Sequence, residues 1–391
     1  MNRLIVVLFI TIVFKTEAQT SVLNVADSLY ATGNYSKAIE KYKAYNAQNE
    51  VFYKIAKAYN ALGNYDAALS SFEAAIKANP DDALIKYDYA KLLYRTKKYN
   101  DASEVFHALI ETDSLNPNYH YELGLVFERL KDTTARRLSR ESFGRAFKLD
   151  ETHQKAIFKI AKYYLVKRKH DTVSYLVNKG LESYENNKAL ISVKAQNYYW
   201  KEQYHKAYNW FEKLIELKES SQFIHEKASF SYASVYNYKK AIEHLKLALK
   251  FDSKNATNLY ILGDLYAKNN NYELAEKYIK MSLMLQDVPL DTEYLKLGTI
   301  FNHQKKYREA IEVLKIALKE NPNNHMAQFF LVRSKDEYYK DYDAKIKLYE
   351  DFKKNHPKNP FVKFSDRRLK ELKEEQFLKE GAKEVLSETE N

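Results

Sequence analysis

Pairs of an aromatic residue and a lysine four positions later recur in the N-terminal half of this chain of 391 residues. Three such pairs are Tyr53 with Lys57, Tyr87 with Lys91, and Phe158 with Lys162. On a helix this spacing places the ring and the ammonium group side by side. Rings supply contact area at low entropic cost and lysines attract carboxylates, so such pairs could bind an extended or helical acidic peptide.

Catalytic chemistry has little support in the sequence. The ten histidines are scattered, and the chain lacks the His-Glu-x-x-His, Gly-x-Ser-x-Gly, Gly-x-Gly-x-x-Gly and Gly-Lys-Ser/Thr motifs of metal, nucleophile and phosphate chemistry. His225 and Glu226 are adjacent, so a helix would point them in different directions. Because there is no cysteine, thiol nucleophiles, disulfides and Cys-ligated zinc are excluded. We therefore predict no enzyme activity, no cofactor and no metal.

The composition favours a helical fold. Eight glycines and six prolines are too few for the hairpins of a β-sandwich or β-barrel. Hydrophobic residues make up 45% and aromatic residues 14% of the chain, which predicts a folded protein with a continuous core. The formal net charge of +11 would suit nucleic acid, an anionic membrane surface or an acidic protein partner, and charge alone does not choose among them.

A period of about 34 residues runs through the chain. Its marker is a tyrosine, found at Tyr35, Tyr65, Tyr99, Tyr204, Tyr238, Tyr272, Tyr307 and Tyr342. Around Tyr65, for example, the small residue Ala56 precedes the marker, and Ala68 and the bulky Phe72 follow it. The spacing predicts two helices in each unit, which approach closely through their small residues. The distance from Tyr99 to Tyr204 is three periods plus three residues, which predicts an insertion around residues 131–138.

These positions resemble the tetratricopeptide repeat (TPR) family, whose pattern is a Leu-Gly pair, a Tyr, then Ala-x-x-x-Phe and a Pro. The matching residues of one unit are Ala56, Tyr59, Gly63, Ala68, Phe72, Ala75 and Pro80. The resemblance implies an all-α fold, a right-handed α-α superhelical solenoid of about ten TPR helix pairs whose first helices line a concave face. The fifth unit departs from the pattern, with His170 and Val173 where Tyr and Ala are usual.

The predicted organisation follows from this phase. The TPR array covers 19–359, with units near 19–48, 49–82, 83–116, 117–153, 154–187, 188–221, 222–255, 256–290, 291–324 and 325–359. A C-terminal capping helix is predicted over 360–380, where Phe361, Phe364, Leu369 and Leu372 share one face, and a flexible tail over 381–391. Trp200 and Trp210 fall where the helices of the sixth unit should pack, so we interpret both as structural.

The first residues predict export. Arg3 precedes the apolar run 4–14, and small residues follow, which is the order of a signal peptide over 1–18 with cleavage near Ala18. The run is shorter than the ~20 residues that span a bilayer. We expect a mature chain without a transmembrane segment, periplasmic or secreted, and therefore no nucleic-acid partner.

The fifth position of each unit gives an aromatic column on the concave face, broken at Ser192 and Glu226. Its members are Tyr53, Tyr87, Tyr121, Phe158, Tyr260 and Phe329, with Lys57, Lys91, Arg95 and Lys162 along the same edge. We predict a non-catalytic protein–protein interaction scaffold of the cell envelope, which binds partner proteins or acidic peptides along this face. Two alternatives stay open: the aromatic residues could serve helix packing alone, or the groove could bind an anionic envelope polymer or glycan.

Overall fold

The computed structural model describes residues 22–130, 132–285 and 290–389, with side chains up to residue 379. These residues form helices joined by short turns and contain no strand, which confirms the all-α fold. The predicted signal peptide over 1–18 lies outside the described residues.

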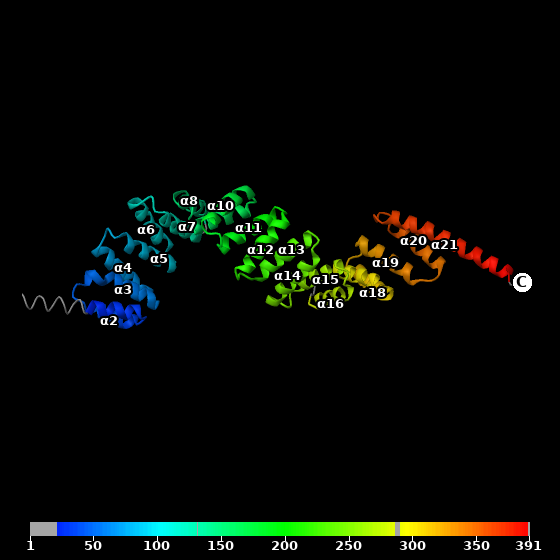
Figure 1. Cartoon of the computed structure of the whole chain (residues 1–391), viewed down its shortest axis with the longest axis horizontal. Helices are drawn as coiled ribbons and strands as arrows, with labels where there is room; N and C mark the ends of the chain where they lie inside the picture. The colour runs from blue at the N-terminus through cyan, green and yellow to red at the C-terminus, as the bar shows by residue number, and fades with distance from the viewer. Residues whose placement is uncertain (1–21, 131, 286–289, 390–391) are drawn as a thin grey trace, which may run out of the picture. The chain divides into compact units, whose positions relative to one another are not determined.

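The helices follow one another in pairs (Figure 1). The first pair is formed by residues 22–31 and α2 (Tyr35–Lys43), and the following helices are α3 (Gln48–Leu62), α4 (Tyr65–Ala78), α5 (Ala83–Arg95), α6 (Tyr99–Thr112), α7 (Pro117–Leu130), α8 (Thr133–Leu149), α9 (Gln154–Val166), α10 (His170–Ser183), α11 (Lys188–Trp200), α12 (Tyr204–Glu216), α13 (Gln222–Ser234), α14 (Tyr238–Phe251), α15 (Ala256–Lys268), α16 (Tyr272–Leu283), α17 (Asp291–His303), α18 (Tyr307–Glu320), α19 (His325–Tyr338), α20 (Tyr342–Asn355) and α21 (Val362–Thr389). Each marker tyrosine is the first residue of the second helix of its pair.

The chain divides into two compact units, and the boundary falls between Val193 and Lys194, inside α11. In the first unit, the core lies between the helices of successive pairs and includes fully buried Ala56, Ala90 and Phe106. In the second unit, the corresponding core runs from α13 to α19. Each helix pair thus buries its apolar face against the next pair of the same unit.

Close contact between a small residue of the first helix and a bulky residue of the second holds each pair together. A Cβ atom added at Gly298 would lie 2.6 Å from Cγ of Leu314, and one added at Gly263 would lie 2.7 Å from Cδ1 of Ile279. Both distances are shorter than carbon atoms tolerate, so the backbone of α17 and of α15 lies directly on the partner side chain. This confirms the packing that the sequence predicts for these positions.

In most pairs, the turn between the two helices contains one residue in the left-handed conformation. In eight turns of the described chain this residue stands two positions before the second helix: Gly33, Gly63, Lys97, Arg168, Glu202, Tyr236, Asn270 and Lys305. The two glycines adopt φ 79°. The other residues adopt φ of 56° to 65°, although this region costs a side chain about 1–2 kcal/mol. Helix packing therefore imposes the turn even where the local sequence does not favour it.

The three extra residues of the fourth repeat, which consists of α7 and α8, lengthen a helix. Helix α8 has 17 residues, whereas the corresponding helix α6 has 14. The Asp132 side chain caps α8 by accepting a hydrogen bond from the backbone N–H of Ala135. Of the insertion predicted around residues 131–138, residues 133–138 are therefore helical and Asp132 is the helix cap.

The C-terminal helix covers the last pair. Leu372 of α21 is fully buried and packs in one cluster with Phe329, Tyr349 and Phe352. Phe364, predicted on the same apolar face, is 55% exposed. The helix continues to Thr389, past residue 380 where the sequence predicts the start of a flexible tail, because residues 381–389 are mostly good helix formers.

A chain of hydrogen-bonded polar side chains, built around the buried His225 and His244, joins α12, α13 and α14 in the second unit. The Nδ1 atoms of His225 and His244 are 3.1 Å apart, so one proton must lie between them. His244 Nε2 lies 3.0 Å from Oε1 of Glu212, and the Tyr232 hydroxyl donates to the same oxygen at 2.9 Å. Ser220 Oγ lies 2.9 Å from His225 Nε2. With both imidazoles neutral, every group in this chain has a partner.

A glycine pair tests the contact between helices. Gly298→Ala should lower the free energy of unfolding by about 1–3 kcal/mol, because the new methyl group overlaps Leu314. Gly144→Ala in α8 is the matched control, since nothing lies within 4 Å of its added Cβ, and it should stabilise by about 0.5–1 kcal/mol. Urea unfolding measures both changes. Equal effects of the two substitutions would contradict the packing described above.

The histidine chain predicts a loss of stability in acid. Burial, and next to it the charge of His244, lower the pKa of His225 below its ordinary 6.5, while Glu212 opposes the shift. Folding therefore disfavours protonation of His225, so its contribution is complete above about pH 6.5 and decreases as the pH falls below that value, by at most about 1.4 kcal/mol per pH unit.

Substitution of His225 measures this effect. His225→Gln should flatten the decrease in unfolding free energy between about pH 7 and about pH 5, whereas His205→Gln, at an exposed position of α12, should preserve it. Tryptophan fluorescence during urea unfolding reports on the second unit, because both tryptophans follow Lys194. An unchanged slope in His225→Gln would show that His225 does not couple protons to folding.

Candidate functional site

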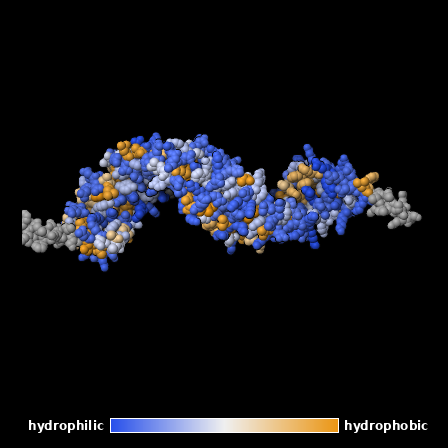
Figure 2. Space-filling model, in the orientation of Figure 1, coloured by the Kyte–Doolittle hydropathy of each residue, from blue (hydrophilic) through white to orange (hydrophobic). Residues whose placement is uncertain are grey.

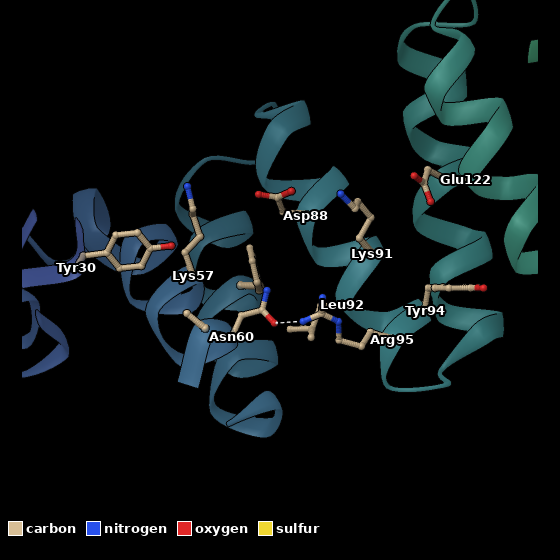
Figure 3. Close-up of a pocket in the computed structure, with 11 residues that line it drawn as sticks. Tyr30, Lys57, Asn60, Asp88, Lys91, Leu92, Tyr94, Arg95 and Glu122 are labelled. Carbon is tan, nitrogen blue, oxygen red and sulfur yellow. Dashed lines mark hydrogen bonds between the residues drawn. The ribbon is translucent and has the colours of Figure 1, made fainter. Parts of the chain in front are cut away.

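A cavity of about 500 Å³ lies on the first helices of the first unit (Figure 3). Its charged and amide side chains are Lys57, Asn60, Asp88, Lys91, Arg95 and Glu122. They come from α3, α5 and α7, and Tyr30 adds a ring from the helix over residues 22–31. Four successive first helices therefore contribute to one surface, as stacking of the repeats requires. We call it the first-unit cavity.

Two lysines of the cavity are held by aromatic rings. The Lys57 ammonium lies 5.3 Å from the centre of the Tyr53 ring, and the Lys91 ammonium lies 5.1 Å from that of Tyr87. These are the cation–π pairs expected from the spacing of four residues. Among the residues that the structure describes, neither ammonium has a carboxylate within 4.0 Å. Both charges are therefore available to a ligand.

Arg95 is positioned by the preceding helix pair. One of its nitrogens donates a hydrogen bond to Oδ1 of Asn60 at 3.3 Å, drawn as a dashed line in Figure 3. Its guanidinium carbon lies 5.8 Å from the centre of the Tyr65 ring. The neutral partners orient the guanidinium group without cancelling its charge.

Two carboxylates make the cavity less basic than the sequence suggests. Asp88 accepts a hydrogen bond from the Tyr53 hydroxyl at 2.8 Å, and Glu122 accepts one from the Tyr87 hydroxyl at 3.4 Å. In the view of Figure 3, the Asp88 carboxylate lies between the Lys57 and Lys91 side chains. Three cations and two carboxylates line the cavity, so its formal charge is +1 when Glu122 is ionised.

The Glu122 carboxyl group has an altered acidity. Burial raises its pKa above the ordinary value of 4.5, while the charges of Lys91 and Lys155 and the Tyr87 hydrogen bond lower it. Burial is also the main reason why the pKa values of Tyr53 and Tyr87 are raised, with their acidic neighbours adding to the shift. Both phenols therefore remain protonated donors at neutral pH.

The tyrosines at the fifth position also hold the repeats together. The ring centre of Tyr53 lies 6.0 Å from that of Phe72 in its own pair, and its hydroxyl binds Asp88 of the next pair. The ring centre of Tyr87 lies 6.1 Å from that of Phe106, and its hydroxyl binds Glu122 of the next helix pair. These contacts are the ones expected if the aromatic residues serve helix packing. The partner-binding role of the two tyrosines stays a prediction.

The other members of the predicted column lie elsewhere. Phe158 and Lys162 pair at 5.8 Å on α9, but they are not among the residues that line the first-unit cavity. Tyr121 and Phe329 are each 8% exposed and offer little contact area. Tyr260 is partly buried in α15 of the second unit. The structure therefore brings together Lys57, Lys91 and Arg95, with Tyr53 and Tyr87 holding the two lysines.

Sequence reasoning missed several residues that line the cavity. They are Tyr30, Asn60, Asp88, Tyr94 and Glu122. A signal existed, because contacts between successive first helices join residues 35 positions apart, as in Tyr53 with Asp88, Tyr87 with Glu122 and Asn60 with Arg95. An acidic residue 35 positions after a fifth-position tyrosine marks such a contact.

The remaining candidate chemistry is limited. Among the side chains that the structure describes, no group of three or more His, Asp or Glu is arranged to hold a metal ion. Over the same residues, every helix is too short or too polar to span a bilayer. Trp200, interpreted as structural from the sequence, packs against Tyr199 with 5.1 Å between ring centres, and 43% of it is also exposed.

Comparisons with known proteins agree with the fold. The family model described as tetratricopeptide repeat matches residues 59–123, and that of anaphase-promoting complex, cyclosome, subunit 3 matches residues 234–317. A TPR repeat-containing protein of Methanocaldococcus jannaschii is 23% identical over 305 residues, which cover 62% of this chain and 54% of that protein. The DnaJ homolog subfamily C member 3 of Bos taurus is 24% identical over 287 residues, which cover 70% of this chain and 49% of that protein.

Solved structures include similar helix arrays. YrrB, described as a TPR protein with an unusual peptide-binding site, matches 49% of this chain and 97% of its own length at 16% identity, with a TM-score of 0.46. The chain spans about half or less of the length of the curated relatives that it matches.

The described chain is an all-α repeat protein built from stacked helix pairs. The 34-residue period, the helix pairs and the two matched segments identify these pairs as repeats of the tetratricopeptide type. Such proteins are in general protein-interaction scaffolds without catalytic activity.

Removing one lysine tests the electrostatics of the cavity. Lys91→Ala should raise the pKa of Glu122, because the Lys91 charge is the largest influence that lowers it. Lys57→Ala is the matched control and should leave this pKa unchanged, since Lys57 is not among the groups that shift it. Titration of the carboxyl carbon signal of Glu122, assigned with Glu122→Gln, measures the value. A pKa that does not move in Lys91→Ala would contradict the placement of that ammonium group.

Proposed function

We propose that this chain is a non-catalytic interaction scaffold that is exported to the cell envelope and binds a segment of a partner protein in the first-unit cavity. The observation that carries the proposal is the set of three cations, Lys57, Lys91 and Arg95, on one cavity formed by successive first helices. Their charges are oriented by rings and an amide, so a ligand meets cations that are already in place.

The charges of the cavity favour a segment with carboxylates. Carboxylates of the ligand would pair with the two lysines and with Arg95, which offers a fork of donors. The cavity's own Asp88 and Glu122 accept hydrogen bonds from tyrosines, which spreads their negative charge. Since three cations face these two carboxylates, the net charge of the cavity stays positive. A segment that also carries hydroxyl or amide donors would fit these two carboxylates better than a purely acidic one.

Export rests on the N-terminal sequence. Arg3, the apolar run 4–14 and the small residue Ala18 have the order of a signal peptide. The mature protein would then begin at Gln19 and remain in the periplasm or be secreted. Mass spectrometry of the protein recovered from the envelope fraction tests this part separately, and a recovered N-terminal peptide that retains residues 1–18 would contradict it.

A crosslinked pull-down from the native cell envelope tests the cavity. The bait is residues 19–391, and the variant carries Lys57→Ala, Lys91→Ala and Arg95→Ala. The three substitutions spare the tyrosines that hold the repeats together. We expect a partner that is recovered by the bait and reduced about tenfold or more with the variant, and whose affinity for the bait falls with salt.

A control variant removes the same charge elsewhere. Lys41→Ala, Lys77→Ala and Lys98→Ala also remove three positive charges, from exposed positions on or next to the second helices of the first unit. This variant should recover the partner as well as the bait does. If both variants lose the partner equally, net charge rather than the cavity carries the binding. If neither loses it, the cavity is not the binding surface.

The second candidate function is binding of an anionic envelope polymer or glycan. The aromatic and cationic side chains of the cavity suit such a ligand as well. It would be favoured if the bait retained envelope polysaccharide but no protein, and if the cavity variant lost that retention.

A further inference from the structure

The second unit carries a separate surface of aromatic side chains. Tyr199 and Trp200 of α11 and Phe223 of α13 lie around the Lys227 ammonium group. Phe230 of α13 contacts the ring of Tyr199, and Tyr204 of α12 contacts the ring of Phe230. Of these, Trp200 is 43%, Phe223 41% and Phe230 50% exposed. Figure 2 shows that the molecular face it presents is mostly hydrophilic, with small separate hydrophobic areas. We call these six residues the aromatic patch.

Lys227 lies among rings and not against a carboxylate. Its ammonium group is 4.8 Å from the ring centre of Tyr199, 5.8 Å from that of Trp200 and 5.7 Å from that of Phe223. Over the described residues, no carboxylate oxygen lies within 4.0 Å of it. The neighbouring Glu226 is occupied by the amides of Gln222 and Asn258. The patch therefore presents one uncompensated positive charge in an apolar setting.

The angles between the rings distinguish among ligands. Tyr199 meets Trp200 at 81° and Phe230 at 60°, and Tyr204 meets Phe230 at 63°. Rings at these angles present edges and faces in turn and form no flat platform. A sugar ring stacks best on a flat aromatic face, whereas branched or aromatic side chains of a peptide fit an uneven apolar surface.

We propose that the aromatic patch is a second docking surface of this scaffold, for a partner segment in which large apolar side chains flank a single carboxylate. The apolar side chains cover Trp200, Phe223 and Phe230, and the carboxylate pairs with Lys227. Exposed tryptophan and tyrosine side chains are the residues that most often dominate binding energy at protein interfaces. Exclusion of water by the rings strengthens the ion pair at their centre. The proposal does not depend on the first-unit cavity, which lies in the other unit.

The probe for this surface is a random peptide library displayed on phage and selected on residues 19–391. We expect selected peptides in which Asp or Glu stands next to aromatic or large aliphatic residues. Synthetic copies should bind with an affinity that falls about tenfold or more in Trp200→Ala/Phe230→Ala and in Lys227→Ala. Changing the peptide's carboxylate to the amide should weaken binding to the bait but not to Lys227→Ala, which is the signature of a direct pair.

Matched controls come from the same unit. Tyr236→Ala and Phe251→Ala remove exposed rings outside the patch, and Lys239→Ala removes an exposed lysine of α14. These variants should bind the peptides like the bait. The substituted rings are 43–79% exposed and Lys239 is also exposed, so the variants should keep the unfolding midpoint of the bait. A changed midpoint disqualifies that variant in favour of single substitutions at Trp200 or Phe230.

Three results would overturn the proposal. One is that every selected peptide binds the patch variants as well as it binds the bait. Peptides that bind the first-unit cavity, and are therefore lost with Lys57→Ala/Lys91→Ala/Arg95→Ala, would be of this kind. Another is selection of peptides whose binding needs Trp200 and Phe230 but is the same in Lys227→Ala. The third is binding of a neutral oligosaccharide that Trp200→Ala/Phe230→Ala abolishes while the selected peptides do not compete.

Discussion

The close approach of two helices through a single small residue is the constraint on which the described structure depends. At Gly298 and Gly263, the backbone of the first helix touches a bulky side chain of the second so closely that one added carbon would overlap it. Repetition of this contact gives each pair nearly the same geometry, so equivalent residues of successive first helices in a unit face the same way. The first-unit cavity exists because Lys57, Lys91 and Arg95 occupy such equivalent or neighbouring positions.

The sequence predicts the helices well because this contact has a clear residue signature. Ala or Gly before the marker tyrosine, and a bulky residue after it, give the phase from which the second helices at Tyr65, Tyr99 and Tyr204 begin. The turns are harder to recognise, since Lys97 and Tyr236 adopt the left-handed conformation without being glycine. There the close packing of the two helices outweighs the local cost, which no local pattern reveals.

The candidate site is only partly predictable, for a physical reason. The ring and ammonium of Tyr53 and Lys57 lie on one helix, so their spacing alone places them together. Asp88 reaches the same place from the next helix pair, and its role appears only when the stacking of pairs is known. The sequence therefore predicts the cations of the cavity and misses its carboxylates. The lysines alone lead one to expect an acidic ligand. Because the cavity also contains carboxylates, the ligand that fits it best carries hydrogen-bond donors as well as carboxylates.

The same physical device, an ammonium group held by aromatic rings, occurs in both units with different surroundings. In the first-unit cavity, the Lys91 ammonium group interacts electrostatically with the half-buried Glu122 carboxylate. A ligand carboxylate must therefore compete with Glu122 for this lysine. In the aromatic patch, Lys227 has rings around it and no carboxylate among the described residues within 4.0 Å. A cation in the first setting favours a polar segment with several charges, whereas a cation in the second favours an apolar segment with one carboxylate. A protein with both surfaces would distinguish two segments by their ratio of charge to apolar surface. The aromatic patch would leave the extra charges of a polar segment without partners, and the first-unit cavity would leave the apolar side chains of the other segment among ionic groups. Each surface therefore binds the other's ligand less tightly.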